Sequence, residues 1–152
     1  MNESNQIHIL LADDDKDDCL FFREALEELP IKADLSIVHD GEELLKLLKT
    51  DNKQLPSVIF LDLNMPRING FECLTEINKD QKLRQLPTVI ISTSFKEEKV
   101  EWLNKNGPVY YIRKPSDFSK LKSAILKVIT LLIENNFTRP QSENFVINHP
   151  NQ

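Results

Sequence analysis

Residues 58–71, VIFLDLNMPRINGF, carry the clearest structural signal in the sequence. This stretch opens with an apolar run, Val58–Leu61, that has no polar residue on either face. A strand buried on both faces has this pattern, which is typical of a parallel sheet covered by helices. The run ends at Asp62, a loop containing Pro66 follows, and apolar residues at helical spacing begin after Gly70. The stretch therefore predicts a strand, a loop and a helix in that order.

The same alternation of an apolar run and a helical segment occurs five times along the chain. The other predicted strands are Ile7–Ala12, Leu35–Val38, Thr88–Ile91 and Val109–Ile112, and the predicted helices are Lys16–Leu29, Glu42–Lys49, Gly70–Lys79, Lys96–Lys105 and Phe118–Ile133. Leu35–Val38 is the most mixed run, as expected of an edge strand. Five strand–helix repeats with right-handed crossovers predict an α/β fold with a doubly wound parallel sheet flanked by five helices.

The composition of the chain limits the classes of function that it can have. The chain has 152 residues, enough for one domain, and a formal net charge of −5, which argues against a direct nucleic-acid partner. Its start lacks a basic region followed by an apolar stretch, and no window is long and apolar enough to span a membrane. We therefore expect a cytoplasmic protein with no membrane contact.

Polar side chains with related chemistry follow four of the predicted strands. The first strand delivers Asp13 and Asp14, the third Asp62 and Asn64, the fourth Ser92, and the fifth Lys114. In an open α/β sheet, ligands bind beyond the carboxyl ends of the strands. Clustered carboxylates repel one another unless a cation joins them, and hard oxygen ligands suit Mg²⁺. A carboxylate beside a metal, a hydroxyl and an ammonium can accept a phosphoryl group.

The motifs ILLADDD, IFLDLNMPRINGFE, PTVIISTS and YYIRKP, at these spacings, resemble the receiver domains of two-component response regulators. The resemblance covers about residues 7–133 and is closest to stand-alone, chemotaxis-type members that lack an output domain. It implies a flavodoxin-like fold with strand order 2-1-3-4-5, Mg²⁺ as cofactor, and phosphoryl acceptance from a sensor histidine kinase or a histidine phosphotransfer protein. It also implies a downstream protein target and no enzymatic activity beyond self-catalysed phosphoryl transfer and autodephosphorylation.

The resemblance assigns roles to single residues. It implies Asp62 as the phosphoacceptor, with Lys114 and Ser92 as partners of the phosphoryl group. For Mg²⁺ it implies Asp14 as a direct ligand, Asp13 as a ligand through water and the Asn64 backbone carbonyl as a further ligand. Ser92 and Tyr111 are the implied switch residues. It also implies a cis bond between Lys114 and Pro115. The hydroxyl position holds serine where threonine is commoner, and Thr93 is its neighbour; only one of the two can face the site. We expect the further acids Asp17 and Asp18 to be a solvated helix start.

Other classes of function remain open. A flavodoxin-like cofactor carrier would need a phosphate loop after the first strand, where this chain has DDDKDD. An aspartate-nucleophile phosphatase would place its nucleophile after the first strand and not the third. A receiver-like adaptor that binds partners without phosphorylation is the main alternative, although such proteins usually lack one member of the acid, hydroxyl and lysine set.

The last predicted helix carries two apolar stripes. The first, containing Leu121, Ile125 and Val128, fits a buried face. The second is Leu126, Ile129 and Ile133, which we expect to be exposed and to mark a contact. Three readings are open: a homodimer through this helix, the tail segment 145–147 folded back over it, or a helix end that is apolar without a partner; we favour the homodimer. The tail, residues 134–152, is polar and rich in asparagine, so we expect it to have low order.

Overall fold

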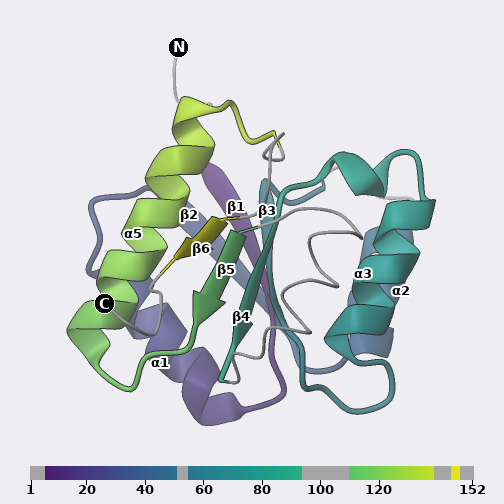
Figure 1. The fold of residues 1–152 in the computed structure, drawn as a ribbon, viewed down its shortest axis with the longest axis horizontal. Coiled ribbons are helices and arrows are strands. Elements are labelled where there is room, and N and C mark those ends of the chain that lie inside the picture. Colours follow the sequence, from purple (N-terminus) through teal and green to yellow (C-terminus); the bar gives the residue numbers. More distant parts are fainter. Residues whose placement is uncertain (1–5, 51–54, 94–109, 139–144, 148–152) are drawn as a thin grey trace.

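The computed structural model describes residues 6–50, 55–93, 110–138 and 145–147 (Figure 1). In chain order the elements are β1 (Ile7–Ala12), α1 (Lys16–Glu27), β2 (Ala33–Val38), α2 (Gly41–Lys49), β3 (Val58–Asp62), α3 (Gly70–Lys79), the 3₁₀ turn η2 (Leu83–Gln85), β4 (Thr88–Ser92), β5 (Tyr110–Arg113), α5 (Phe118–Glu134) and β6 (Phe145–Ile147). The helix predicted at 96–105 lies outside the described residues. None of the described helices is long and apolar enough to cross a membrane.

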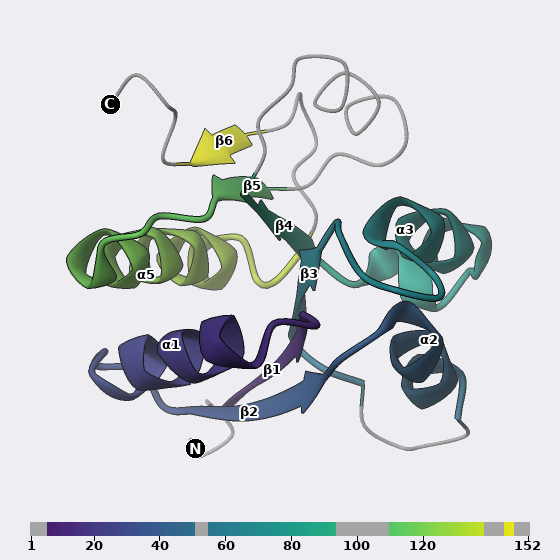
Figure 2. The same cartoon turned by 90° about the horizontal axis from the view of Figure 1, so that it is seen from below.

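The strands form one parallel sheet in the order β2-β1-β3-β4-β5-β6. Its first five members confirm the predicted order 2-1-3-4-5. The sheet lies between two helical layers, with α1 and α5 on one face and α2 and α3 on the other (Figure 2). Every residue of β3 and β4 is buried, whereas β2 alternates between half-buried and exposed residues, as its mixed sequence predicts for an edge.

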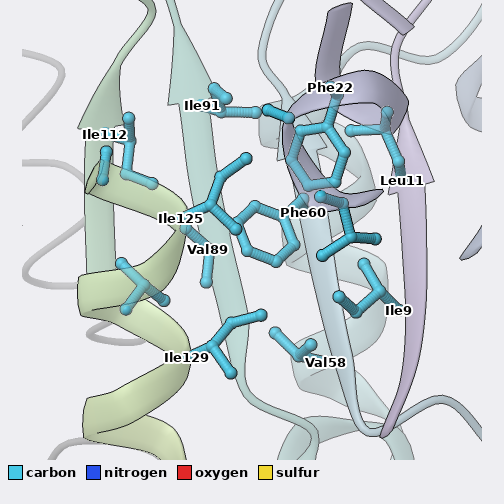
Figure 3. Close-up of a cluster of buried hydrophobic side chains, with 14 of the residues drawn as sticks. Ile9, Leu11, Phe22, Val58, Phe60, Val89, Ile91, Ile112, Ile125 and Ile129 are labelled. Carbon is cyan, nitrogen blue, oxygen red and sulfur yellow. The ribbon is translucent and has the colours of Figure 1, made fainter. Parts of the chain in front are cut away.

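Alternate side chains of the central strands pack into two separate hydrophobic cores, one on each face of the sheet. Phe60 lies on the α1–α5 side and packs edge-on against Phe22, with ring centroids 5.0 Å apart (Figure 3). Complete burial of a side chain such as Phe60 contributes ~2–3 kcal/mol to folding. Leu61, the next residue, belongs to the core on the α2–α3 side. Because both sides are filled, β3 holds its last residue, Asp62, at a fixed place at the edge of the sheet.

A sixth strand, which the sequence did not predict, lies within the polar tail. Residues Phe145–Ile147 pair in parallel with β5, from Tyr110 opposite Phe145 to Ile112 opposite Ile147. The outer edge of β5 would otherwise present unpaired backbone groups, and a short apolar triplet can pair with them. In the segment before it, Phe137 packs against the α1–α5 core, so the ordered part of the chain extends beyond the predicted helix end.

The second stripe of α5 is not a continuous exposed surface, which corrects a prediction from the sequence. Ile129 is fully buried and faces β3 and β4 beside Val58 and Val89 (Figure 3). Only Leu126 and Ile133, 36% and 50% exposed, remain at the surface. The prediction was wrong because the α1–α5 core is wide enough to take Ile129 together with the first stripe. The segment 145–147, the other predicted contact, pairs with β5 and continues the sheet.

Candidate functional site

The predicted site residues meet at one edge of the sheet. Asp13 follows β1, Asp62 ends β3, Ser92 ends β4 and Lys114 follows β5. The register places the end of β1, Ala12, opposite Leu61, and Ser92 opposite Arg113, so the residues that follow lie side by side. The Lys114 backbone N–H also donates to the Ser92 carbonyl at 2.7 Å, which ties the end of β5 to that of β4. Four strand ends that are far apart in the sequence thus form one polar site.

Three carboxylates of this site lie close together. One oxygen each from Asp13, Asp14 and Asp62 lies within 4.8 Å of the other two, which is a spacing that a single metal ion can bridge. Asp13 and Asp62 are buried, whereas Asp14 is exposed. The group therefore combines two carboxylates shielded from water with one that is open to an arriving ion.

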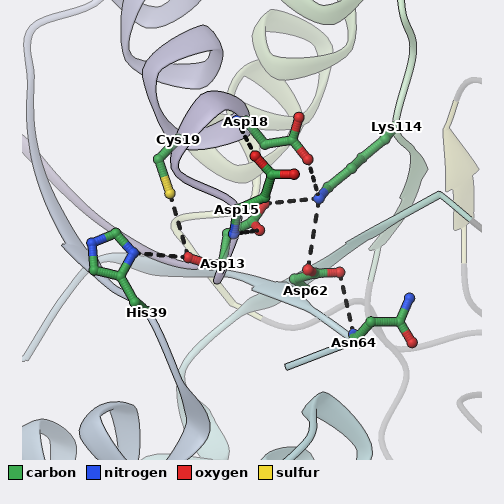
Figure 4. Close-up of polar contacts among 8 residues, drawn as sticks. All are labelled: Asp13, Asp15, Asp18, Cys19, His39, Asp62, Asn64 and Lys114. Atoms are coloured by element: carbon green, nitrogen blue, oxygen red, sulfur yellow. Dashed lines mark hydrogen bonds and ion pairs between the residues drawn. The ribbon is translucent and has the colours of Figure 1, made fainter. Parts of the chain in front are cut away.

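Lys114 places a positive charge among these acids. Its Nζ lies 2.8 Å from Asp13 Oδ2, 2.8 Å from Asp18 Oδ2 and 3.6 Å from Asp62 Oδ2 (Figure 4). Burial alone would lower the pKa of Lys114, but the hydrogen bonds to Asp13 and Asp18 outweigh burial and hold the pKa above its ordinary value. The ammonium is therefore charged and reduces the repulsion between the buried carboxylates.

Asp62 keeps a raised pKa in spite of that ammonium. Burial raises the pKa of its carboxyl group to about 7; Lys114 lowers it, Asp13 raises it, and a hydrogen bond from the Asn64 backbone N–H lowers it. That bond is 3.3 Å long and ends on Asp62 Oδ1. The protein alone therefore stabilises the negative charge of ionised Asp62 only in part. A further cation beside Asp62 would favour the ionised carboxylate.

The turn after β1 is held by its own acids and by two neighbouring side chains. The Asp13 backbone carbonyl accepts from the Cys19 thiol at 3.4 Å and lies 3.1 Å from His39 Nδ1. Asp13 Oδ1 accepts from the Asp15 backbone N–H, and Asp15 in turn caps α1 by accepting from the Asp18 N–H, both at 3.0 Å. The sequence DDDKDD therefore folds into a fixed helix start that aims the Asp13 carboxylate at the site.

The loop between β3 and α3 brings Gly70 against the backbone of Asp62 and Leu63. The Gly70 N–H donates to the Leu63 carbonyl at 3.0 Å, and a Cβ at Gly70 would lie 2.5 Å from the Asp62 carbonyl oxygen. Only glycine fits there. Asn69 and Glu72 form a reciprocal capping box that starts α3. The NMPRING motif thus fixes how the chain leaves Asp62.

The two predicted switch residues contact each other. Ser92 is fully buried, whereas its neighbour Thr93 is exposed, so Ser92 is the hydroxyl on the inner side. Tyr111 is also fully buried and belongs to the core on the α2–α3 side. Burial raises the pKa of Tyr111, and a side-chain hydrogen bond with Ser92 acts in the opposite direction. The two side chains are therefore coupled in this conformation.

Two features differ from what the sequence led us to expect. Asp18 is not merely a solvated helix residue, because it holds Lys114; the signal for this was its place in the first turn of α1, beside the acidic pair. The Lys114–Pro115 bond is trans, since the described part of the chain contains no cis peptide. Trans is the ground state of X–Pro bonds by ~0.5–1 kcal/mol.

Comparison with known proteins identifies the family. Residues 9–126 match the model of the response regulator receiver domain. The chain belongs to this family. A similar curated protein is the "Probable methanogenesis regulatory protein FilR2" of Methanothrix harundinacea, 28% identical over 123 residues, which are 79% of each chain. Across the curated relatives compared, this receiver spans 46–79% of their length.

Solved receiver structures have the same fold. The crystal structure of the phosphorylated cyanobacterial phytochrome response regulator RcpA is 31% identical, with a TM-score of 0.76 over 90% of this chain and 99% of that one. The Mn²⁺-bound form of response regulator Rcp1 is 28% identical, with a TM-score of 0.74 over 89% and 99% of the two chains.

Proposed function

We propose that this receiver domain accepts a phosphoryl group on Asp62 in a Mg²⁺-dependent reaction and thereby switches a protein-binding surface. One observation carries the proposal. Asp62 is buried at the end of β3, within one metal-sized cluster with Asp13 and Asp14, and Lys114 approaches it from the end of β5. A strand terminator with no chemical role would not need two further acids and an ammonium around it.

The bonds that form and break in the transfer lie between Asp62 and the donor. An Asp62 carboxylate oxygen attacks the phosphorus of a donor phosphohistidine, and a new O–P bond forms. The N–P bond of the donor breaks, and its electron pair stays on the imidazole nitrogen, which takes up a proton from water. The Lys114 ammonium would stabilise the charge on the phosphoryl oxygens, and the Ser92 hydroxyl would donate to one of them.

The donor set fits Mg²⁺. Asp13, Asp14 and Asp62 offer hard oxygens, and Asp14 is open to a hydrated ion that keeps several of its waters. We propose these three carboxylates and the Asn64 backbone carbonyl as the metal ligands, with Asp13 acting through water. When bound, the metal supplies positive charge against the developing negative charge of phosphoryl transfer. That a Mn²⁺-bound form of the similar regulator Rcp1 exists supports the binding of a divalent cation by this receiver.

The switch would run through Ser92 and Tyr111. A phosphoryl group would draw the Ser92 hydroxyl toward Asp62, and the hydrogen bond that Ser92 makes with Tyr111 would have to change. Because Tyr111 is fully buried in β5, such a change alters packing next to the outer part of the sheet. This couples the chemistry at Asp62 to the side of the molecule that carries β5.

The partners follow from this role. We propose a sensor histidine kinase or a histidine phosphotransfer protein as donor, a downstream protein target, and a cytoplasmic location, where kinases find ATP. Autodephosphorylation would be the one further reaction. The net charge of −5 disfavours nucleic acid as a partner. A homodimer through α5 remains a proposal, which the exposed Leu126 and Ile133 support.

Acetyl phosphate tests the proposal without knowledge of the kinase. With Mg²⁺, the intact mass should rise by one phosphoryl group as acetate leaves, and the gain should be lost in Asp62→Asn and in the presence of a metal chelator. Unchanged mass of a folded wild-type protein would favour the adaptor that works without phosphorylation. Uptake by Asp62→Asn equal to wild type would place the phosphoryl group elsewhere.

A further inference from the structure

The Lys114 ammonium lies closer to Asp18 than to the phosphoacceptor Asp62. The Lys114 ammonium has three N–H donors, and it makes 2.8 Å contacts with Asp13 and Asp18, whereas Asp62 lies at 3.6 Å, too far for a hydrogen bond (Figure 4). The Asp18 contact joins residues that are 96 positions apart in the sequence. The lysine expected to meet a phosphoryl group is therefore bound more closely by a carboxylate of α1 than by Asp62 itself.

The local structure of α1 leaves the Asp18 carboxylate available for this contact. Asp18 is the third residue of α1 after the cap, Asp15, and an acid in that position often reaches back to the backbone N–H of the cap residue. Glu72 does this at the start of α3, where it accepts from the Asn69 N–H. In α1 the equivalent Asp15 N–H is already bound by Asp13 Oδ1. The Asp18 side chain extends to Lys114 instead.

The surroundings strengthen the ion pair. The Lys114 side chain is 13% exposed and that of Asp18 38% exposed. Both line a cavity of about 30 Å³ whose other walls include Leu11, Phe22 and Leu121. Apolar walls reduce the screening of a charge pair by water. Asp18 is also separate from the proposed metal ligands, since the metal-sized cluster consists of Asp13, Asp14 and Asp62.

We infer that Asp18 is a positioning residue that competes with the phosphoryl group for the Lys114 ammonium and so limits how strongly the phosphorylated state is held. The inference rests on the proposed phosphorylation of Asp62. A cation held through Asp13 would weaken the contact of Asp13 with Lys114, but it would leave the Asp18 contact in place. A phosphoryl group, with about two negative charges and three acceptor oxygens, must then displace Asp18 to gain the lysine.

Beryllofluoride, a noncovalent phosphoryl analogue, tests the competition at saturating Mg²⁺. Asp18→Asn keeps the shape of the side chain but removes its charge, so the analogue should bind about fivefold more tightly, the effect of weakening one half-exposed ion pair. Asp17→Asn is the matched control: it removes the same charge from the same helix turn and should change the affinity less than twofold. Asp18→Glu, which keeps the charge, should behave like wild type.

A second measurement separates positioning from a structural role in the helix. In metal-free buffer, the unfolding free energies of Asp18→Asn, Lys114→Met and the double variant form a double-mutant cycle. The change in unfolding free energy caused by Asp18→Asn should be smaller when Lys114 is replaced. The change caused by Asp17→Asn should not depend on Lys114. Equal analogue affinity in the Asp18 and Asp17 variants, or an Asp18 effect that Lys114→Met leaves unchanged, would overturn the inference. Wild-type protein that binds no analogue and takes up no phosphoryl group, while the cycle still shows coupling, would instead reject the proposed function.

Discussion

Replacing Asp62 by asparagine should stabilise the metal-free protein, and the gain should grow with pH. Burial raises the pKa of the Asp62 carboxyl group from its ordinary 3.8 to about 7. Between these two pH values the folded protein holds a proton that the unfolded chain has released. The unfolding free energy then falls by ~1.4 kcal/mol for each unit that the pH rises, and this fall stops once the pH exceeds the folded pKa. From pH 5 to pH 8, the unfolding free energy of wild type should therefore fall by about 2–3 kcal/mol. That of Asp62→Asn, which has no titrating group at this position, should not show this fall.

Urea unfolding followed by circular dichroism, in chelator at pH 5, 6, 7 and 8, measures this difference. Asp17→Asn is the control, because it removes one negative charge from an exposed position of α1. Its stability relative to wild type should stay within ~0.5 kcal/mol at every pH. A difference between Asp62→Asn and wild type that does not change from pH 5 to pH 8 would refute the reasoning, and so would one that shrinks as the pH rises.

Three further substitutions, one of them with a surface control, test the site and the fold. Gly70→Ala would place a Cβ 2.5 Å from the Asp62 carbonyl oxygen, so urea unfolding should show a loss of about 3 kcal/mol; an unchanged midpoint would contradict the geometry. Ile129→Glu should prevent folding, as measured by circular dichroism, because it buries a charge. Its control, Leu126→Glu, changes a surface residue and should fold normally. A folded Ile129 variant would show that α5 packs differently. Lys114→Ala should take up the phosphoryl group from acetyl phosphate more slowly and then fail to change the affinity for its protein target; normal switching would exclude a signalling role for this lysine.

The central strands could be predicted from the sequence because burial on both faces leaves a simple pattern. The run Val58–Leu61 is apolar throughout, and β3 indeed lies in the middle of the sheet with no exposed residue. The site followed from the same pattern, since the carboxyl ends of parallel strands must meet at one edge. The resemblance then supplied roles for residues whose convergence the strand pattern already indicated.

The missed features depend on contacts between distant segments. The strand β6 is three residues long, and only its pairing with β5 distinguishes it from the polar tail around it. The burial of Ile129 depends on the width of the α1–α5 core, which the periodicity of one helix does not report. The contact of Asp18 with Lys114 arises because Asp13 occupies the backbone N–H that Asp18 would otherwise bind.

The most direct test of the account is to locate the phosphoryl group itself. After reaction with acetyl phosphate and Mg²⁺, borohydride reduces an aspartyl phosphate to homoserine, and peptide mass spectrometry finds the modified position. Homoserine is expected at position 62, and its formation should depend on metal and on acetyl phosphate. Homoserine at Asp13 or Asp14, or none in a folded protein that binds Mg²⁺, would contradict it.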